Sequence, residues 1–334
     1  MTLPRHCHER TYVVTHDLGN RFAGLRTLGL KTPESDDDIF IKLHEGVKNF
    51  LTTVLPDDVQ VITFDMEKLV EDIWGQAIHC QTRIRDSFVI SSCIEVASSR
   101  RGQTIEINRI VDINGHTIGY GPRPGYPSVN IQMQAIAMRS GGNPVILAED
   151  GAFTGGTINF MVKCAKDSGV EIAAIVVGLC FPEALETIRK FFDGEVIVVE
   201  EVGKPYEWMP DHDFIPFAPN CGRVFGGIFG NEALPHYSHD GLSFSLPYVL
   251  PFGDPVEWAS IPQDSAREFS LFCLHQSLGL FRELEKINGK RILLKDLAGS
   301  TPRVSIPLSK GYSYLPGSDL AVTDFLSDAC HELS

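Results

Sequence analysis

Between residues 144 and 202 the hydrophobic pattern changes period several times. Apolar runs of strand length occupy residues 145–149, 170–178 and 195–202. Between them, apolar residues recur at helical spacing over 157–168 and 182–192, and Ser168-Gly169 and Asp193-Gly194 end these two segments. The central run is apolar almost throughout, which is typical of a strand covered on both faces. This β-α-β-α-β order predicts a parallel sheet with right-handed crossovers, and therefore an α/β, Rossmann-like fold.

The pattern elsewhere is less regular. Helical spacing predicts helices over 39–55, 65–80, 129–139 and 264–288, the last ending at Gly289, and a short helix near 320–331. Residues 88–96, 104–113 and 116–120 are expected to form strands, and 203–262, dense in Pro, Gly and aromatics, an irregular hood with short strands. We therefore expect an N-terminal extension that contributes to a hood (1–85), an α/β core (86–202) and a C-terminal hood with a helical extension (203–334).

Composition narrows the class of protein. The 334 residues are 43% hydrophobic and 22% charged, which is ordinary for a globular protein. No apolar run reaches the length of a membrane span, and the polar N-terminus argues against a secretory signal, so we expect a cytoplasmic protein. Eight cysteines without a CxxC pair fit reduced, buried thiols. The net charge of −14 argues against broad nucleic-acid binding.

The strongest motif runs from Val145 to Thr157, with the sequence VILAEDGAFTGGT. Four apolar strand residues precede the acids Glu149 and Asp150, and a Thr-Gly-Gly-Thr turn then opens a helix. This stretch resembles the phosphoribosyl-pyrophosphate (PRPP) motif of type I phosphoribosyltransferases, in their purine and xanthine branch. The resemblance is strong over 144–202 and weak elsewhere, and Gly151, Ala152 and Phe153 depart from the usual family residues.

The physical chemistry of the turn agrees with this resemblance. Glycines allow the backbone to approach a phosphate closely, and the amides and dipole at a helix N-terminus attract an anion. We therefore expect the backbone and hydroxyls of Phe153, Thr154, Gly155, Gly156 and Thr157 to bind the 5′-phosphate of PRPP. The absence of a Lys after Gly156 argues against a nucleoside-triphosphate-hydrolysing loop.

The resemblance also implies the reaction. Glu149 and Asp150 would accept hydrogen bonds from the ribose hydroxyls and stabilise positive charge on the ring as pyrophosphate leaves. Mg²⁺ would bridge pyrophosphate and ribose, and the substrates would be PRPP and a purine-like base or nucleotide. We expect a homodimer.

Two loops are candidates for the pyrophosphate site. The first, 98–102, includes Arg100, Arg101 and Gly102, and the second, 121–125, includes Arg123. Arginine suits bidentate phosphate binding. We favour the first loop, because it leaves 103–125 as the flap that closes over the reaction in this family, although a plain hairpin turn explains either loop equally well.

Further residues carry weaker hypotheses. Trp208, Phe214, Phe217 and Phe225 follow the third strand, where the family hood covers the base, so they could stack on it. The His and Asp groups at 211–213 and 236–240 could bind a metal, but we favour surface or hydrogen-bonded side chains, because neither group has helical spacing.

Two other functions compete with the enzyme. A catalytically silent relative could sense PRPP or a nucleotide and regulate a partner, and the unclear pyrophosphate loop favours this alternative. A DNA-binding relative is disfavoured by the acidic charge and by the lack of an evident helix-turn-helix.

Overall fold

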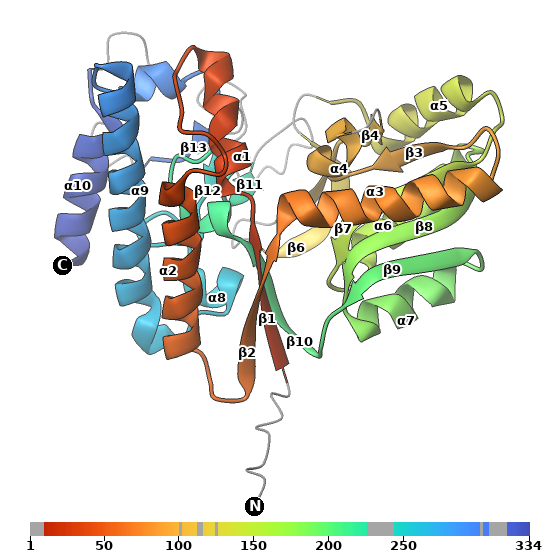
Figure 1. Cartoon of the computed structure of the whole chain (residues 1–334), viewed down its shortest axis with the longest axis horizontal. Coiled ribbons are helices and arrows are strands. Elements are labelled where there is room, and N and C mark those ends of the chain that lie inside the picture. The colour runs from red at the N-terminus through yellow and green to blue at the C-terminus, as the bar shows by residue number, and fades with distance from the viewer. Residues whose placement is uncertain are drawn as a thin grey trace, which may run out of the picture. The chain divides into compact units, whose positions relative to one another are not determined.

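The computed structural model describes residues 10–99, 102–111, 116–123, 126–225, 244–300, 303–306 and 319–334. The chain divides into two compact units. Among the described residues, the first unit consists mainly of 64–110 and 117–206, and the second mainly of 12–63 and 207–334. Each unit is described by itself below (Figure 1).

The first unit is built on a five-stranded sheet with the strand order β4-β3-β7-β8-β9. Its strands are β3 (Phe88–Ser91), β4 (Gln103–Thr104), β7 (Val145–Ala152), β8 (Ile172–Cys180) and β9 (Glu195–Glu201). Every neighbouring pair is parallel. Helices α6 (Gly156–Asp167) and α7 (Pro182–Phe191) connect β7 to β8 and β8 to β9. The predicted β-α-β-α-β order and parallel pairing are confirmed.

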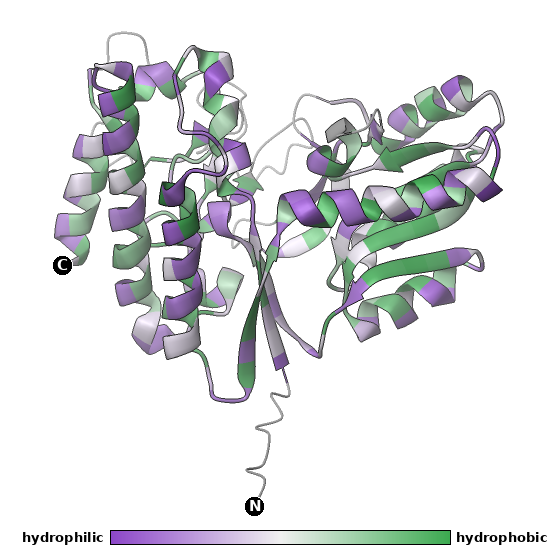
Figure 2. Ribbon diagram, in the orientation of Figure 1, coloured by the Kyte–Doolittle hydropathy of each residue, from purple (hydrophilic) through white to green (hydrophobic). Residues whose placement is uncertain are grey.

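The centre of this sheet is apolar on both faces. Residues 174–180 of β8 and 145–149 of β7 are all buried, and the strands around them are mostly green in Figure 2. Helix α3 (Met66–Arg83) packs on β7, β8 and β9. Gly178 permits this packing, because a Cβ atom there would lie only 2.8 Å from Ile73 Cδ1. The buried strand β8 therefore pairs alongside Glu149, with Val177 as its partner in the register.

Two predicted strands of the first unit are shorter than expected. The strand predicted over 88–96 ends at Ser91, and helix α4 (Ile94–Ser99) follows it. The Ser91 hydroxyl accepts a hydrogen bond from the Cys93 amide. The Cys93 amide therefore bonds to a side chain instead of a neighbouring strand, and the chain turns there. The β-branched residues of 104–113 are divided between the edge strand β4 and a separate strand, β5 (Ile107–Val111).

Three elements complete the first unit. Strand β5 pairs with β6 (Thr117–Pro122) in a two-stranded sheet. Helix α5 (Val129–Ser140) matches the predicted helix, with the Ser128 hydroxyl as its N-cap and Gly141 in the left-handed region at its end. It packs against α6.

The second unit combines helices with small sheets. The helices are α1 (Leu18–Ala23), α2 (Asp38–Val54), α8 (Pro255–Ala259), α9 (Ala266–Asn288) and α10 (Val322–Leu333), with short 3-10 helices η1 (Gly24–Leu28), η2 (Asp211–Phe214), η3 (Gln263–Ser265) and η4 (Leu294–Leu297). One sheet has the order β10-β1-β2, from β10 (Pro205–Pro210), β1 (Arg10–His16) and β2 (Val59–Asp65). The other has the order β11-β12-β13, from β11 (Arg223–Phe225), β12 (Phe244–Leu246) and β13 (Arg303–Val304).

Helices α9 and α10 pack together, and α9 ends at Gly289 in the left-handed conformation, as its sequence predicts. The expected short strands within 203–262 are present as β10, β11 and β12.

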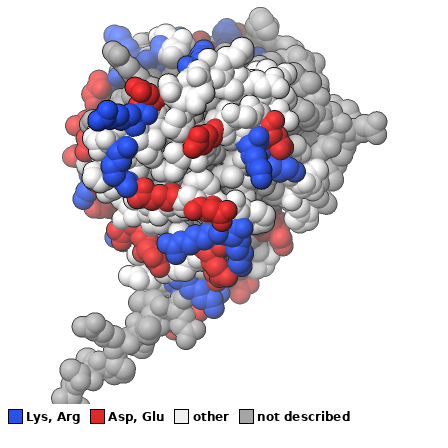
Figure 3. Space-filling view, turned by 90° about the vertical axis from the view of Figure 1, so that its right-hand side faces the viewer, with Lys and Arg blue, Asp and Glu red and all other residues white. Residues whose placement is uncertain are grey.

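Charged side chains of both signs mix on one face of the described surface (Figure 3). On the face in Figure 3, Lys and Arg side chains lie interspersed with Asp and Glu rather than in a wide basic patch. None of the helices within the described ranges is long and apolar enough to cross a membrane.

Candidate functional site

The acidic pair and the glycine turn lie close together in the chain at the carboxyl end of β7. Glu149 and Asp150 belong to the strand, which continues to Ala152, and helix α6 begins at Gly156. Ligands of open α/β sheets bind at this edge, beyond the carboxyl ends of parallel strands. The structure therefore places the two acids and the predicted phosphate turn near one edge of the sheet.

Glycine is favoured at the two positions of the turn for different structural reasons. Gly155, the N-cap of α6, has φ +78°, and a Cβ atom there would lie 3.1 Å from Ala184 O of α7. A larger residue would therefore be strained by its backbone and crowded by its neighbour. A Cβ atom on Gly156 would instead collide with the hydroxyl of Tyr120, which belongs to β6.

Tyr120 is a residue of this site that the sequence analysis did not find. Its ring stacks on Phe160 of α6, with 5.5 Å between centroids and 26° between ring planes. Strand β6 thus reaches the first turn of α6. The only sequence signal is the position of Tyr120 within the loop region 103–125, which was expected to act as a flap.

The hydroxyls of the turn differ in exposure. Thr154 is exposed, and its Oγ1 accepts a hydrogen bond of 3.4 Å from the Gly156 amide. Thr157 is half-buried in the first turn of α6, and Phe153 makes an edge-to-face contact with Phe181 at 5.2 Å. Thr154 is therefore the more exposed of the two hydroxyls.

Glu149 is a buried acid with a raised pKa. Its side chain is 3% exposed, and Ser92 donates to both carboxyl oxygens, from its amide to Oε1 at 2.6 Å and from its hydroxyl to Oε2 at 2.5 Å. Burial and the neighbouring charge of Asp150 raise the pKa of Glu149 to about 8, against the opposing effect of the Ser92 hydrogen bonds. Glu149 is therefore mostly protonated at neutral pH. Asp150 is half-buried and accepts a hydrogen bond from the Gly151 amide at 2.8 Å.

Ser92 was missed because the strand before it was predicted to be too long. The carboxyl end of β3 lies beside that of β7, since these two strands are adjacent and parallel. A strand ending at Ser91 would have indicated that the next residues meet Glu149.

The pyrophosphate candidates are only partly described. Arg100 and Arg101 lie outside the described residues, and Gly102 packs against Ala97 of α4. Arg123 is described: its guanidinium donates to Ser92 O at 3.4 Å and to Ile107 O at 3.1 Å. It also lies 3.5 Å from a Glu106 carboxyl oxygen. The structure therefore brings Arg123 to the residue that bonds Glu149.

The aromatic candidates for base stacking belong to the second unit. Phe214 and Phe217 are 0% and 4% exposed, and both pack edge-to-face against other phenylalanines, including Phe269 and Phe281. Their faces are therefore occupied by the core of that unit. Trp208 is half-buried and its indole donates to Thr15 Oγ1 at 3.5 Å, while the side chain of Phe225 lies outside the described set.

Of the two groups considered as metal ligands, the structure describes only one. Residues 236–240 lie outside the described residues. Asp211, His212 and Asp213 lie in η2 (Asp211–Phe214) and are buried with hydrogen-bond partners. His212 Nδ1 bonds Asp17 Oδ1 at 2.7 Å, and Asp213 accepts from the Gly222 amide at 2.6 Å. Burial raises the pKa of Asp213.

Comparison with known proteins adds little to this geometry. No protein-family model matches the chain, and no curated protein matches it either. Among solved structures, the protein TT1426 from Thermus thermophilus is similar at 15% sequence identity, over 41% of this chain and 81% of that one. The TM-score is 0.26, a value too low to carry an argument about family or function.

Proposed function

We propose that the chain transfers a phosphoribosyl group between PRPP and a purine-like nitrogenous base, with release or uptake of pyrophosphate. One observation carries the proposal: two acids lie near the carboxyl end of a buried parallel strand, and a glycine turn with a left-handed N-cap opens a helix a few residues later. An anion at this helix N-terminus and a ribose beside the acids would belong to one ligand.

Each part of the site has a role in this proposal. The amides at the start of α6 and the hydroxyls of Thr154 and Thr157 bind the 5′-phosphate. Asp150 and Glu149 accept or donate hydrogen bonds to the ribose hydroxyls. As the bond to pyrophosphate breaks, the ribosyl ring becomes cationic, and the carboxylate charge stabilises it. Asp150 supplies most of this charge, because Glu149 is mostly neutral below about pH 8. Arg123 is the described candidate for the pyrophosphate.

The acids also fit Mg²⁺, which the family resemblance implies. Mg²⁺ prefers oxygen ligands and is commonly bound through one or two carboxylates together with substrate phosphates. Asp150 is half-buried and presents a carboxylate at the sheet edge, so it could hold the ion with the oxygens of the substrate. Bound there, Mg²⁺ would offset the charge of the leaving pyrophosphate.

A second function is favoured by one specific contact. Ser92 engages both oxygens of Glu149, so this acid is already satisfied within the protein. A catalytically silent sensor of PRPP or a nucleotide would keep the phosphate turn but would not need a free acid pair. Turnover separates this alternative from the enzyme.

The phosphate turn can be tested by binding. Replacing Thr154 by Val removes an exposed hydroxyl while keeping the side-chain shape. Losing a hydrogen bond to a charged group costs about 1.5–3 kcal/mol, so T154V should weaken PRPP binding about ten- to a hundredfold. Calorimetric titration with PRPP and Mg²⁺ measures the change.

The matched control is T82V, since Thr82 is an exposed threonine on α3 of the same unit. T82V should bind PRPP like the wild type. Equal PRPP affinity in T154V and the wild type would remove the turn from the binding site.

A further inference from the structure

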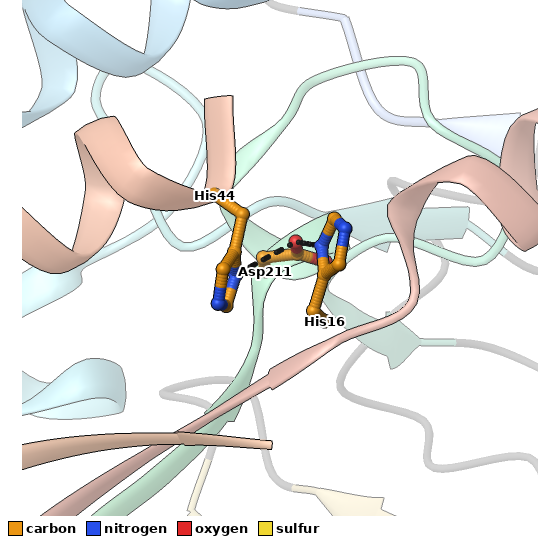
Figure 4. A group of neighbouring side chains, drawn as sticks. All are labelled: His16, His44 and Asp211. Atoms are coloured by element: carbon orange, nitrogen blue, oxygen red, sulfur yellow. Dashed lines mark hydrogen bonds and ion pairs between the residues drawn. The ribbon is translucent and has the colours of Figure 1, made fainter. Parts of the chain in front are cut away.

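Three side chains of the second unit converge on one point, although they are far from one another in sequence. His16 ends β1, His44 lies in α2, and Asp211 begins η2. Figure 4 shows both imidazole rings turned toward the Asp211 carboxylate. The ring centroids of the two histidines are 4.3 Å apart. This arrangement is separate from the acids and turn of the proposed phosphoribosyl site.

Both histidines aim the same ring atom at the same oxygen. His16 Nδ1 lies 2.6 Å from Asp211 Oδ2, and His44 Nδ1 lies 3.4 Å from it. Ligands of a tetrahedral zinc ion, at about 2.0–2.1 Å from the metal, are about 3.3–3.4 Å apart. The His44 separation already has this value. The His16 separation is that of a hydrogen bond, and a shift of about 0.7 Å would bring it to the tetrahedral spacing.

The Nδ1 atom of His44 is a buried nitrogen without a hydrogen-bond partner. A buried polar atom left in this state destabilises the folded protein. His16 occupies the carboxylate oxygen that His44 also faces, so one oxygen serves two imidazoles. A cation among the three groups would engage all of them at once.

The Asp211 carboxylate is held in position by its other oxygen. Oδ1 accepts hydrogen bonds from the backbone amides of Asp17 at 3.2 Å and Leu18 at 3.1 Å. The side chain is fully buried. Burial opposes its ionisation, but the two imidazoles hold the pKa of Asp211 below its ordinary value. Such outer hydrogen bonds orient the carboxylate ligands of metal sites and leave one oxygen for the ion.

Other acidic groups are buried near the cluster. The carboxyl groups of Asp17 and Asp213 are buried within this region, and Arg21 and His212 are partners of Asp17. The group Asp17, Asp211 and His212 is also close enough to hold an ion. It is a poorer candidate, because Asp17 already bonds both Arg21 and His212.

We propose that His16 Nδ1, His44 Nδ1 and Asp211 Oδ2 bind a first-row divalent transition-metal ion such as Zn²⁺. Imidazole nitrogens select these metals over Mg²⁺ and Ca²⁺, which prefer oxygen. Three protein ligands leave a coordination position for water or another molecule. The side chains of His16 and His44 are 17% and 13% exposed, which gives an ion access to the site.

The test uses the full chain freed of metal with a chelator and titrated with ZnCl₂ in a calorimeter at neutral pH. The wild type should bind Zn²⁺ at this site, and H16A and H44A should each weaken that binding by about a hundredfold or more, since even outer-shell partners are worth 10–100-fold. H275A is the matched control, because His275 is an exposed histidine on α9 of the same unit. It should leave Zn²⁺ affinity unchanged.

A second measurement covers variants that fail to fold. Co²⁺ bound to the wild-type protein should give a spectrum without the thiolate charge-transfer band, as expected for nitrogen and oxygen ligands. The proposal is overturned if the wild type binds no Zn²⁺, if folded H16A and H44A bind it as tightly as the wild type, or if the Co²⁺ spectrum shows thiolate ligation. None of these outcomes depends on PRPP, so they leave the proposed transferase function untouched.

Discussion

The carboxyl group of Glu149 is buried, and the next residue, Asp150, carries a negative charge. Its side chain is 3% exposed, and its pKa is raised to about 8 by burial and by Asp150. An unfolded glutamic acid ionises near pH 4.5. The folded protein therefore keeps a proton on Glu149 over a range in which the unfolded chain has lost it. This difference makes the stability of the protein depend on pH.

The stabilising effect of this proton should be complete below about pH 4.5 and lost as the pH rises toward 8. Between these values the unfolded chain binds fewer protons, so Glu149 lowers the free energy of unfolding by about 1.4 kcal/mol per pH unit. E149Q, which stays neutral and keeps the shape of the side chain, should lack this contribution. Urea denaturation of both proteins between about pH 5 and 9 measures the two slopes.

The two stability curves should therefore diverge with increasing pH, with E149Q gaining relative to the wild type up to about pH 8. Parallel curves would mean that Glu149 ionises normally in the folded protein. In that case it would be a charged acid at neutral pH, equal to Asp150 in the proposed chemistry.

Strand β6 and helix α6 meet at the phosphate turn, through Tyr120 and Gly156. Ala at position 156 would collide with the Tyr120 hydroxyl, whose ring is held by stacking on Phe160. Overpacking of this kind costs about 1–3 kcal/mol, so G156A should lower the free energy of unfolding by that amount. Y120F should relieve most of the cost, because the Cβ atom then faces the ring carbon at 3.3 Å.

G155A provides the control for this double-mutant cycle. Its cost comes from the left-handed backbone and from α7, so Y120F should not relieve it. Urea denaturation of the single and double variants measures the coupling free energies. If G156A lowers the free energy of unfolding equally with Tyr or Phe at position 120, Tyr120 of β6 does not lie against the turn as described.

The elements that the sequence predicts well are those whose pattern is dense and local. Strands β7, β8 and β9 and helices α6, α7 and α9 have continuous apolar runs or a long helical stripe, with glycine at the turns. The glycine turn before α6 was predicted because its residue types lie next to one another in the chain. Such features need no knowledge of which segments pair.

Contacts between distant segments could not be predicted in this way. Ser92 meets Glu149 only because β3 pairs with β7, and the strand before Ser92 was predicted to continue to residue 96. His16 and His44 have no motif of their own, and they reach Asp211 through a sheet and two helical segments that are far apart in sequence. Phe214 and Phe217 look the same in sequence whether they pack in a core or stack on a base.

The residues of the two candidate sites belong to different units of the chain. The first unit contains Glu149, Asp150, the turn 153–157 and Arg123, and the second contains the His16, His44 and Asp211 cluster. Metal binding at the cluster and PRPP binding at the turn therefore need separate measurements on the full chain. The central claim concerns the first of these units.

Pyrophosphate release from PRPP tests that claim most directly. The assay combines the full chain, PRPP, Mg²⁺ and a panel of purine bases, and compares the wild type with D150N, E149Q and the double variant. The wild type should release pyrophosphate only with its base. D150N should cut the rate about ten- to a hundredfold, for a loss of about 1.5–3 kcal/mol, and E149Q should cut it less below about pH 8 because Glu149 is mostly neutral there. Nucleotide binding should fall less than the rate, since part of the effect arises only as charge develops.

Saturable PRPP binding by the wild type without pyrophosphate release from any base would support the sensor instead, and a wild type that does not bind PRPP would contradict the account.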